Sequence, residues 1–277
     1  MTNTSSNTQF LVIGAGNMGG ALLSGWVSGR SPIMSPSQLV ILDPKPSEAA
    51  LGAIKKGAIH LSQPSDEVGQ ADVVLVATKP QLFETVVKEV LPYIKSGALV
   101  ISIMAGMTLE TLSKALPNQF HIRAMPNTPA AIKEGVTAFV SGAGVKTPQK
   151  KLAKKLLSAG GKVAEVETEN LIDVVTAVSG SGPAYVFHLA EALEAAAIKI
   201  GMPEDIAPLF ARQTIIGAGA LLKNDERSAK QLREAVTSPN GTTQAALDVL
   251  MDNGAMALLM RETVTAALKR SKELGEA

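Results

Sequence analysis

Three glycines near the start of the chain have the spacing of a phosphate-binding turn. They belong to the run Gly14-Ala15-Gly16-Asn17-Met18-Gly19, which follows the apolar segment 10–13 directly. In a G-x-G-x-x-G pattern the first glycine allows a tight turn, the second lets the backbone approach a pyrophosphate, and the third lets the next helix pack on the strand. An amphipathic stretch at 21–27 follows. This order of strand, turn and helix favours dinucleotide binding by all six residues over an ordinary structural turn.

An acidic residue follows the next apolar segment. Asp43 comes directly after the run 39–42, at the position that contacts the adenosine ribose in dinucleotide sites. A carboxylate there accepts hydrogen bonds from a free 2′-hydroxyl, as in NAD(H), and repels the 2′-phosphate of NADP(H). Lys45 lies two residues further on and can offset that charge. The residues themselves therefore leave both cofactors open.

Further candidate residues follow later apolar segments of the same kind. In an open α/β sheet, ligands bind outside the carboxyl ends of the strands. We therefore expect the cofactor to contact the residues at and just after the ends of the segments 72–77 and 99–103, which are Ala77, Thr78, Lys79, Pro80, Met104 and Ala105. A solvated loop charge is the alternative for Lys79. Asn127 and Thr128, between two prolines, either contact a ligand or cap a turn.

A second candidate site lies far along the chain, at residues 236–244. The Ser-Pro-Asn-Gly sequence at 238–241 is typical of a turn, and Thr242 and Thr243 then open a helix. The start of a helix offers unpaired N–H groups, and the threonines add hydroxyls, so a small carboxylate could bind there. An ordinary threonine N-cap is the alternative.

The elements that must position these residues divide the chain in two. Up to residue 167, apolar strands alternate with helices, which predicts a mostly parallel sheet covered by helices on both faces. From 168 to 277 the pattern is all-α, rich in Ala and Leu. Apolar residues occur on more than one face of these helices, as at 185–190. We therefore expect a homodimer or a larger assembly, with packing against the first domain as the alternative.

Composition excludes several classes of function. The chain has 277 residues, and its 26 basic and 25 acidic side chains give a net charge of +1, which favours neither nucleic acid nor an anionic membrane as partner. It has no cysteine, and its three histidines are far apart, so we expect no metal site. Residues 1–8 lack the features of a signal peptide, and no apolar run approaches the ~20 residues that span a bilayer. The expected location is the cytoplasm.

Several motifs together resemble the pyrroline-5-carboxylate reductase family over essentially the whole chain. They are IGAGNMG at 13–19, ATKP at 77–80, AMPNTP at 124–129, AVSGSGPAY at 177–185 and VTSPNGTT at 236–243. The last two are the most specific. The resemblance implies an N-terminal Rossmann-type domain, a helical dimerisation domain, and dimers that can associate into decamers.

The resemblance also implies a reaction and a set of substrate contacts. The family transfers hydride from NAD(P)H to the C=N bond of 1-pyrroline-5-carboxylate, giving L-proline in the last step of proline biosynthesis. It implies a substrate between the nicotinamide and the 238–243 loop, near the dimer interface. Backbone N–H groups of Thr242 and Thr243 would hold its carboxylate, the Thr243 hydroxyl would face the ring nitrogen as the catalytic group, and Glu226 would lie close by.

The chain departs from the family pattern at two positions. Asn240 stands where the family usually has glycine, and Asn tolerates the left-handed conformation. Asp43 stands where many members carry a small or neutral residue and prefer NADPH. We expect NADP(H), with NAD(H) left open.

Two other functions fit parts of the pattern. A 3-hydroxyacid dehydrogenase-like NAD(P) oxidoreductase has the same layout, but its general acid or base is commonly a lysine on the helix near the start of the second domain. The corresponding segment 184–197 has no lysine. A non-catalytic nucleotide-binding regulatory protein would bind the cofactor without consuming it.

Overall fold

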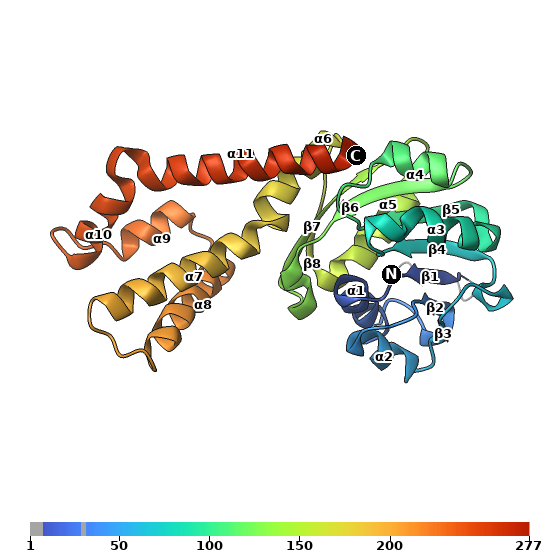
Figure 1. The fold of residues 1–277 in the computed structure, drawn as a ribbon, viewed down its shortest axis with the longest axis horizontal. Coiled ribbons are helices and arrows are strands. Elements are labelled where there is room, and N and C mark those ends of the chain that lie inside the picture. Colours follow the sequence, from blue (N-terminus) through green and yellow to red (C-terminus); the bar gives the residue numbers. More distant parts are fainter. Residues whose placement is uncertain (1–7, 29–31, 277) are drawn as a thin grey trace. The chain divides into compact units, whose positions relative to one another are not determined.

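A computed structural model describes residues 8–28 and 32–276 of the chain. They form two compact units (Figure 1). Unit 1 comprises the chain up to Gly180 together with the C-terminal residues from Ala267, and unit 2 comprises Ser181–Ala266. The residues 1–7, in which we expect no signal peptide, lie outside the described part. The division by role at residues 1–167 and 168–277 stays a prediction.

Unit 1 is built on one sheet of eight strands in the order β3-β2-β1-β4-β5-β6-β7-β8. All neighbouring pairs run parallel except β6 and β7, which are antiparallel. The sheet is thus mostly parallel, as predicted. The strands are β1 Phe10–Ile13, β2 Leu39–Leu42, β3 Ile59–Leu61, β4 Ala71–Val76, β5 Ile94–Ser102, β6 Phe120–Met125, β7 Gly135–Ser141 and β8 Gly161–Glu165.

Two strand assignments from the sequence were incomplete. We did not predict β3, because its apolar-polar-apolar alternation covers only three residues, which is too short to indicate a strand. We also placed the start of β5 at Leu99, whereas the strand begins at Ile94. The residues 95–97 are exposed and polar or glycine, so they lack the apolar character of the rest of the strand.

Helices cover both faces of this sheet (Figure 1). Along β1, Phe10 and Val12 pack with α1, α2 and α5, whereas Leu11 and Ile13 pack with α3 and α4 on the opposite face. Because both faces are buried, the central strands read as continuous apolar runs. The helices of this unit are α1 Asn17–Val27, α2 Glu48–Ile54, α3 Phe83–Val90, α4 Leu109–Ala115, α5 Thr147–Leu157, α6 Asn170–Val175 and the last residues of α11 Ala255–Glu276.

The strand order places the candidate cofactor residues at one point of the sheet. β1 pairs with β2 on one side and with β4 on the other, so the chain reverses its direction of progress across the sheet at β1. In open α/β sheets, ligands bind at the carboxyl ends of the strands beside such a reversal. The turns after β1, β2 and β4 therefore lie together.

Unit 2 consists of helices and buries little of its own apolar surface. Of its residues only Ala207 and Ala211 are buried, while Phe187, Leu209 and Ile216 are at least 60% exposed in the single chain. Its helices are α7 Gly182–Lys199, α8 Ala207–Asn224, α9 Ala229–Ala235, α10 Thr242–Met251 and the first part of α11. No helix in the described ranges is both long and apolar enough to cross a membrane.

Candidate functional site

The turn after β1 can be made only with glycine at two of its positions. Gly14 has φ +87°, and a Cβ there would lie 2.8 Å from the carbonyl carbon of Ala77. A Cβ on Gly19 would collide with the carbonyl oxygen of Gly14. The first glycine thus permits the turn between β1 and the end of β4, and the third brings α1 against it.

The middle glycine has a different environment. Gly16 is exposed, and a Cβ there would meet no heavy atom within 4 Å. It is also the N-cap residue of α1 and provides no side chain to satisfy the first N–H groups of the helix. Its backbone therefore leaves open space and unpaired donors beside it, which is the arrangement that receives a phosphate at a helix N-terminus.

Asp43 connects the end of β2 with the glycine turn. Its Oδ2 accepts a hydrogen bond from the Ala15 N–H at 2.5 Å, and its Oδ1 accepts one from the Lys45 N–H at 2.7 Å. His60, from the unpredicted strand β3, lies with its Nε2 2.9 Å from the Asp43 carbonyl oxygen. Both carboxylate oxygens are thus held by backbone donors, which offsets part of the negative charge.

A cavity of about 430 Å³ opens at this edge of the sheet. Six of the predicted cofactor residues line it, namely Gly14, Gly16, Asp43, Ala77, Thr78 and Lys79. The sequence missed the rest of its wall, which includes Ser62, Gln63, Pro64, Leu82, Val86 and Glu89. The segment 62–64 follows β3, so predicting that strand from the Gly57 helix stop and the Ile59–Leu61 alternation would have brought it to notice.

The other predicted cofactor residues lie around the same turns but outside this wall. Asn17 and Met18 line a separate cavity of about 730 Å³ beside α1 and α2. Met104 is buried, and its sulfur accepts a hydrogen bond from Thr78 Oγ1 at 3.3 Å, which joins the turns after β4 and β5. Ala105 is exposed in the latter turn, and Pro80 begins a short 3₁₀ helix.

Asn127 has a structural partner in this structure. Its side chain is buried, and its Oδ1 accepts a hydrogen bond from the Val136 N–H at 2.9 Å. This bond links the end of β6 to β7. Asn127 is the N-cap residue of the 3₁₀ turn at 128–132, but its side chain makes no capping bond there, so its role in ligand binding stays a prediction.

The candidate substrate loop belongs to unit 2. Asn240 adopts φ +59°, and the Gly241 N–H donates to the Ser238 carbonyl at 3.0 Å, which closes the turn. α10 then begins at Thr242 with no side-chain cap on Gly241. Thr242 is exposed and Thr243 half-buried. The first N–H groups of this ten-residue helix are therefore available to an anion.

Glu226 lies in the connection between α8 and α9 of the same unit. Its side chain is exposed, and its neighbours Asp225 and Arg227 form an ion pair at 2.6 Å. The hydrogen bond from the Arg227 side chain lowers the pKa of Asp225 to about 2. This ion pair stabilises the short connection that contains Glu226.

Comparison with known proteins assigns both parts of the chain. The family model for pyrroline-5-carboxylate reductase dimerisation matches residues 169–274, and the model described as NADP oxidoreductase, coenzyme F420-dependent, matches residues 9–106. A pyrroline-5-carboxylate reductase from Synechocystis is 39% identical over 97% of this chain and 98% of its own length.

Two solved structures share the fold along nearly the full length. The pyrroline-5-carboxylate reductase from Coxiella burnetii has a TM-score of 0.88 and 33% identity, covering 98% of this chain and 99% of its own. The pyrroline carboxylate reductase from Plasmodium falciparum, solved with NADP bound, has a TM-score of 0.79 and 28% identity over 98% and 99% of the two chains. With its Rossmann-type sheet, its glycine turn and its helical unit, the chain belongs to the pyrroline-5-carboxylate reductase family.

Proposed function

We propose that this protein reduces the C=N bond of 1-pyrroline-5-carboxylate to give L-proline, with NADPH or NADH as the reductant. The observation that carries the proposal is likeness to reductases of this substrate along nearly the entire chain, at up to 39% identity among those compared. The likeness includes both the nucleotide turn of unit 1 and the threonine loop of unit 2. Retention of both halves fits an enzyme that uses a dinucleotide and a small acid together.

The residues of unit 1 fit a bound dinucleotide. The open space at Gly16 admits a pyrophosphate, and the uncapped start of α1 offers it N–H donors and the positive end of the helix dipole. The cavity lined by Asp43, Leu82 and Val86 among others suits the adenosine portion. When bound, the reduced nicotinamide supplies the hydride.

The residues of unit 2 fit the substrate carboxylate. The N–H groups of Thr242 and Thr243, at the uncapped start of α10, donate to the carboxylate, and the helix dipole favours its charge. The Thr243 hydroxyl then faces the ring nitrogen. These contacts fix the orientation of the ring, so that C5 faces the hydride donor.

The protein need not supply a strong acid for this reaction. The substrate reacts as the iminium ion, with the proton already on the ring nitrogen. Hydride adds to C5 as the C=N π electrons move to nitrogen, which gives the neutral ring amine, and this amine takes a proton from water. The role of the chain is to hold the two reactants in contact, and such orientation contributes up to ~7–11 kcal/mol to lowering the barrier.

We propose NADP(H) as the preferred cofactor. The N-terminal match to an NADP oxidoreductase model and the NADP bound to the Plasmodium relative support this choice. Asp43 opposes it, but the Ala15 and Lys45 N–H groups hold both of its carboxylate oxygens. This contact weakens the repulsion of a 2′-phosphate.

We propose that unit 2 forms the dimer and that dimers associate into decamers. The large apolar side chains that unit 2 exposes, and its match to the dimerisation model, support the dimer. The decamer rests on the family resemblance. Light scattering of the purified protein measures the assembly.

The test is NADPH and NADH oxidation by the purified protein with 1-pyrroline-5-carboxylate. Oxidation that depends on this imine supports the proposal. In a parallel assay with NADP+ or NAD+, reduction of the nicotinamide by 3-hydroxyacids would identify the alternative dehydrogenase. Tight binding of the nucleotide without turnover of either substrate would identify a regulatory protein.

A further inference from the structure

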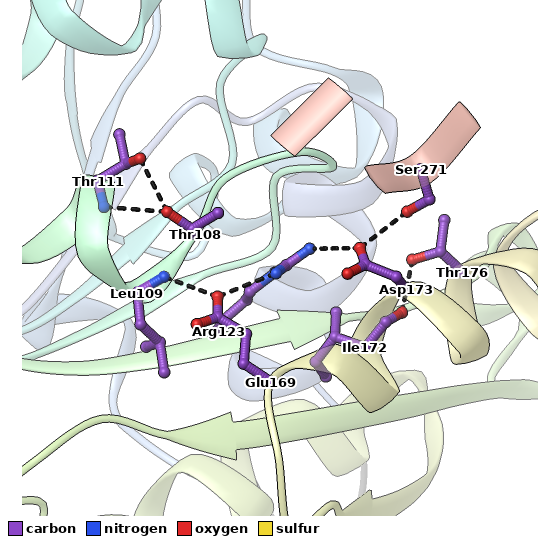
Figure 2. A network of polar contacts seen from close by, with 9 residues as sticks. All are labelled: Thr108, Leu109, Thr111, Arg123, Glu169, Ile172, Asp173, Thr176 and Ser271. Atoms are coloured by element: carbon purple, nitrogen blue, oxygen red, sulfur yellow. Dashed lines mark hydrogen bonds and ion pairs between the residues drawn. The ribbon is translucent and has the colours of Figure 1, made fainter. Parts of the chain in front are cut away.

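A buried arginine in the middle of unit 1 joins segments that are far apart in sequence. Arg123, on β6, is only 3% exposed. Its Nη1 donates to Glu169 Oε1 at 2.9 Å and its Nη2 to Asp173 Oδ1 at 3.1 Å (Figure 2). Neither carboxylate is close to Arg123 in sequence, and the cofactor cavity does not include any of the three.

The two carboxylates extend the contact to further elements. Glu169 Oε1 also accepts a hydrogen bond from the Leu109 N–H at 2.8 Å, at the start of α4. Asp173 Oδ1 also accepts one from Ser271 Oγ at 2.9 Å, on the last part of α11 (Figure 2). One guanidinium therefore fastens α6, α4 and the end of α11 to the sheet. We call these residues, Arg123, Glu169, Asp173 and Ser271, the Arg123 network.

The network holds both chain connections between the units. The chain leaves unit 1 through α6 and the π-helical turn at 176–180, and it returns along α11 from residue 267. Asp173 lies on the outgoing connection and Ser271 on the returning one. The same oxygen, Asp173 Oδ1, contacts both Arg123 and Ser271, so the roots of the two connections are fixed to one point.

The outgoing connection contains an irregular helical turn at residues 176–180. π-Helical turns within helices are rare and are frequent at functional sites. Gly180 ends this turn, and a Cβ there would lie 3.0 Å from Met125 Cε, at the end of β6. Arg123 is thus two residues from Met125, the last residue of β6, whose side chain lies against this turn.

Burial of the guanidinium makes the network costly, since the Arg123 side chain is 4% exposed, although the Glu169 side chain remains 30% exposed. Buried ion pairs often contribute little net stability compared with apolar residues, and their better-attested role is to specify one arrangement among several. The Arg123 Nε is buried without a partner among the described residues. The contact thus depends on the two Nη groups, and a single-point cation such as lysine could not bridge both carboxylates.

We propose that Arg123 is a positioning residue for hydride transfer, acting through Asp173 and Ser271 on the two connections. The inference rests on the proposed function, in which unit 1 holds the nicotinamide and unit 2 the substrate carboxylate. By holding the roots of α6 and α11 on the sheet, the network limits the directions in which the two connections can leave unit 1. Loosening them lowers the fraction of complexes in which C5 meets the hydride donor.

Two mild variants test this without emptying the buried site. Ser271→Ala removes only the hydrogen bond between α11 and Asp173. Asp173→Asn removes the negative charge of the carboxylate that contacts both Arg123 and Ser271. Their matched controls in unit 1 are Ser113→Ala, which removes an exposed bond to the Glu110 carbonyl, and Asp72→Asn. The second weakens the pair of the half-buried Asp72 with Lys95, while the amide oxygen can still accept from the Gln9 N–H. Arg123→Lys completes the series, since it keeps the charge but not the bridge.

We expect kcat to fall about three- to tenfold in Ser271→Ala and about tenfold or more in Asp173→Asn and Arg123→Lys, because small misplacements of reactants are costly. The Kd for NADPH and the dimer content should match those of the controls. A uniformly structural role would instead change stability and nucleotide affinity together, without selective loss of kcat. Unchanged kcat in Ser271→Ala and Asp173→Asn would overturn the proposal.

A distance measurement separates this inference from the proposed function. The chain has no cysteine, so spin labels can be attached at Lys88→Cys in unit 1 and Glu204→Cys in unit 2, both exposed. With labelled chains diluted in unlabelled protein, electron double resonance should give a broader distance distribution in Asp173→Asn than in Asp72→Asn. Equal widths would overturn the positioning role, whichever substrate the enzyme reduces.

Discussion

Replacing the glycines of the nucleotide turn one at a time should separate folding from cofactor binding. Gly14 and Gly16 are two residues apart, yet their surroundings differ. A Cβ on Gly14 would lie 2.8 Å from three backbone atoms of residues 77 and 78, whereas a Cβ on Gly16 meets nothing within 4 Å. Gly14→Ala should therefore damage the fold, and Gly16→Ala should damage only the site.

The magnitudes follow from these contacts. In Gly14→Ala, the left-handed backbone costs ~1–2 kcal/mol and overlap with fixed backbone adds ~1–3 kcal/mol, so the free energy of unfolding should fall by ~2–5 kcal/mol. Gly16 already has φ −67°, so alanine should change the stability by less than ~1 kcal/mol. Its methyl group would keep the pyrophosphate from the backbone, and the loss of one charged hydrogen bond raises the Kd for NADPH about ten- to hundredfold.

The single tryptophan makes the stability assay specific for unit 1. Trp26 lies on α1 and is 1% exposed, and its Nε1–H donates to the Leu156 carbonyl at 2.8 Å. Its fluorescence during urea unfolding gives the free energy of unfolding, and NADPH fluorescence gives the Kd. Gly52→Ala, an exposed position in α2 with free space around it, is the control that should slightly stabilise. Equal destabilisation by Gly14→Ala and Gly16→Ala, with normal NADPH affinity in Gly16→Ala, would show that the two glycines do not have these separate roles.

Three further substitutions test the substrate loop, the cofactor preference and a buried histidine. Thr243→Val should lower kcat/KM for the imine about tenfold or more, with little change in unfolding, because a hydroxyl at the substrate is lost; wild-type kinetics would remove its role. Asp43→Ser should raise the NADPH-to-NADH ratio of kcat/KM about tenfold, since a repulsion of ~1–2 kcal/mol disappears; an unchanged ratio would place the discrimination elsewhere. Burial lowers the pKa of His121 from 6.5, so its contribution to stability is complete above that pH and is lost as the pH falls through the window below it. Urea midpoints should thus decrease from about pH 7.5 to about pH 5.5, and less so in His121→Leu; equal slopes would exclude His121 as the cause.

The sequence predicted the parts of the fold that depend on local pattern. Continuous apolar runs identified the central strands, because both faces of the sheet are covered, and the G-x-G-x-x-G spacing identified the turn at Gly14. The strand β3 was missed because three residues are too short a run to indicate a strand, and only their parallel pairing with β2 identifies it. For the same reason, the sequence did not indicate the part of the cavity wall formed by Ser62, Gln63 and Pro64.

Contacts between residues that are far apart in the sequence could not be predicted, for a related reason. The bond from the Ala15 N–H to Asp43 spans 28 positions, and those from Arg123 to Glu169 and Asp173 span 46 and 50. No periodicity connects residues so far apart. Charge spacing cannot separate a buried arginine on β6 from the many solvated ones. Only the register of the sheet and the packing of α6 bring these groups together.

In the proposed reaction, hydride moves from the nicotinamide to the imine carbon while the chain holds both reactants. The most direct measurement uses NADPH carrying deuterium at the transferred position of C4, with 1-pyrroline-5-carboxylate and the purified protein. Mass spectrometry of the product should show L-proline with one deuterium, located at C5. Unlabelled proline, or oxidation of NADPH without proline, would contradict direct hydride transfer from the nicotinamide to C5.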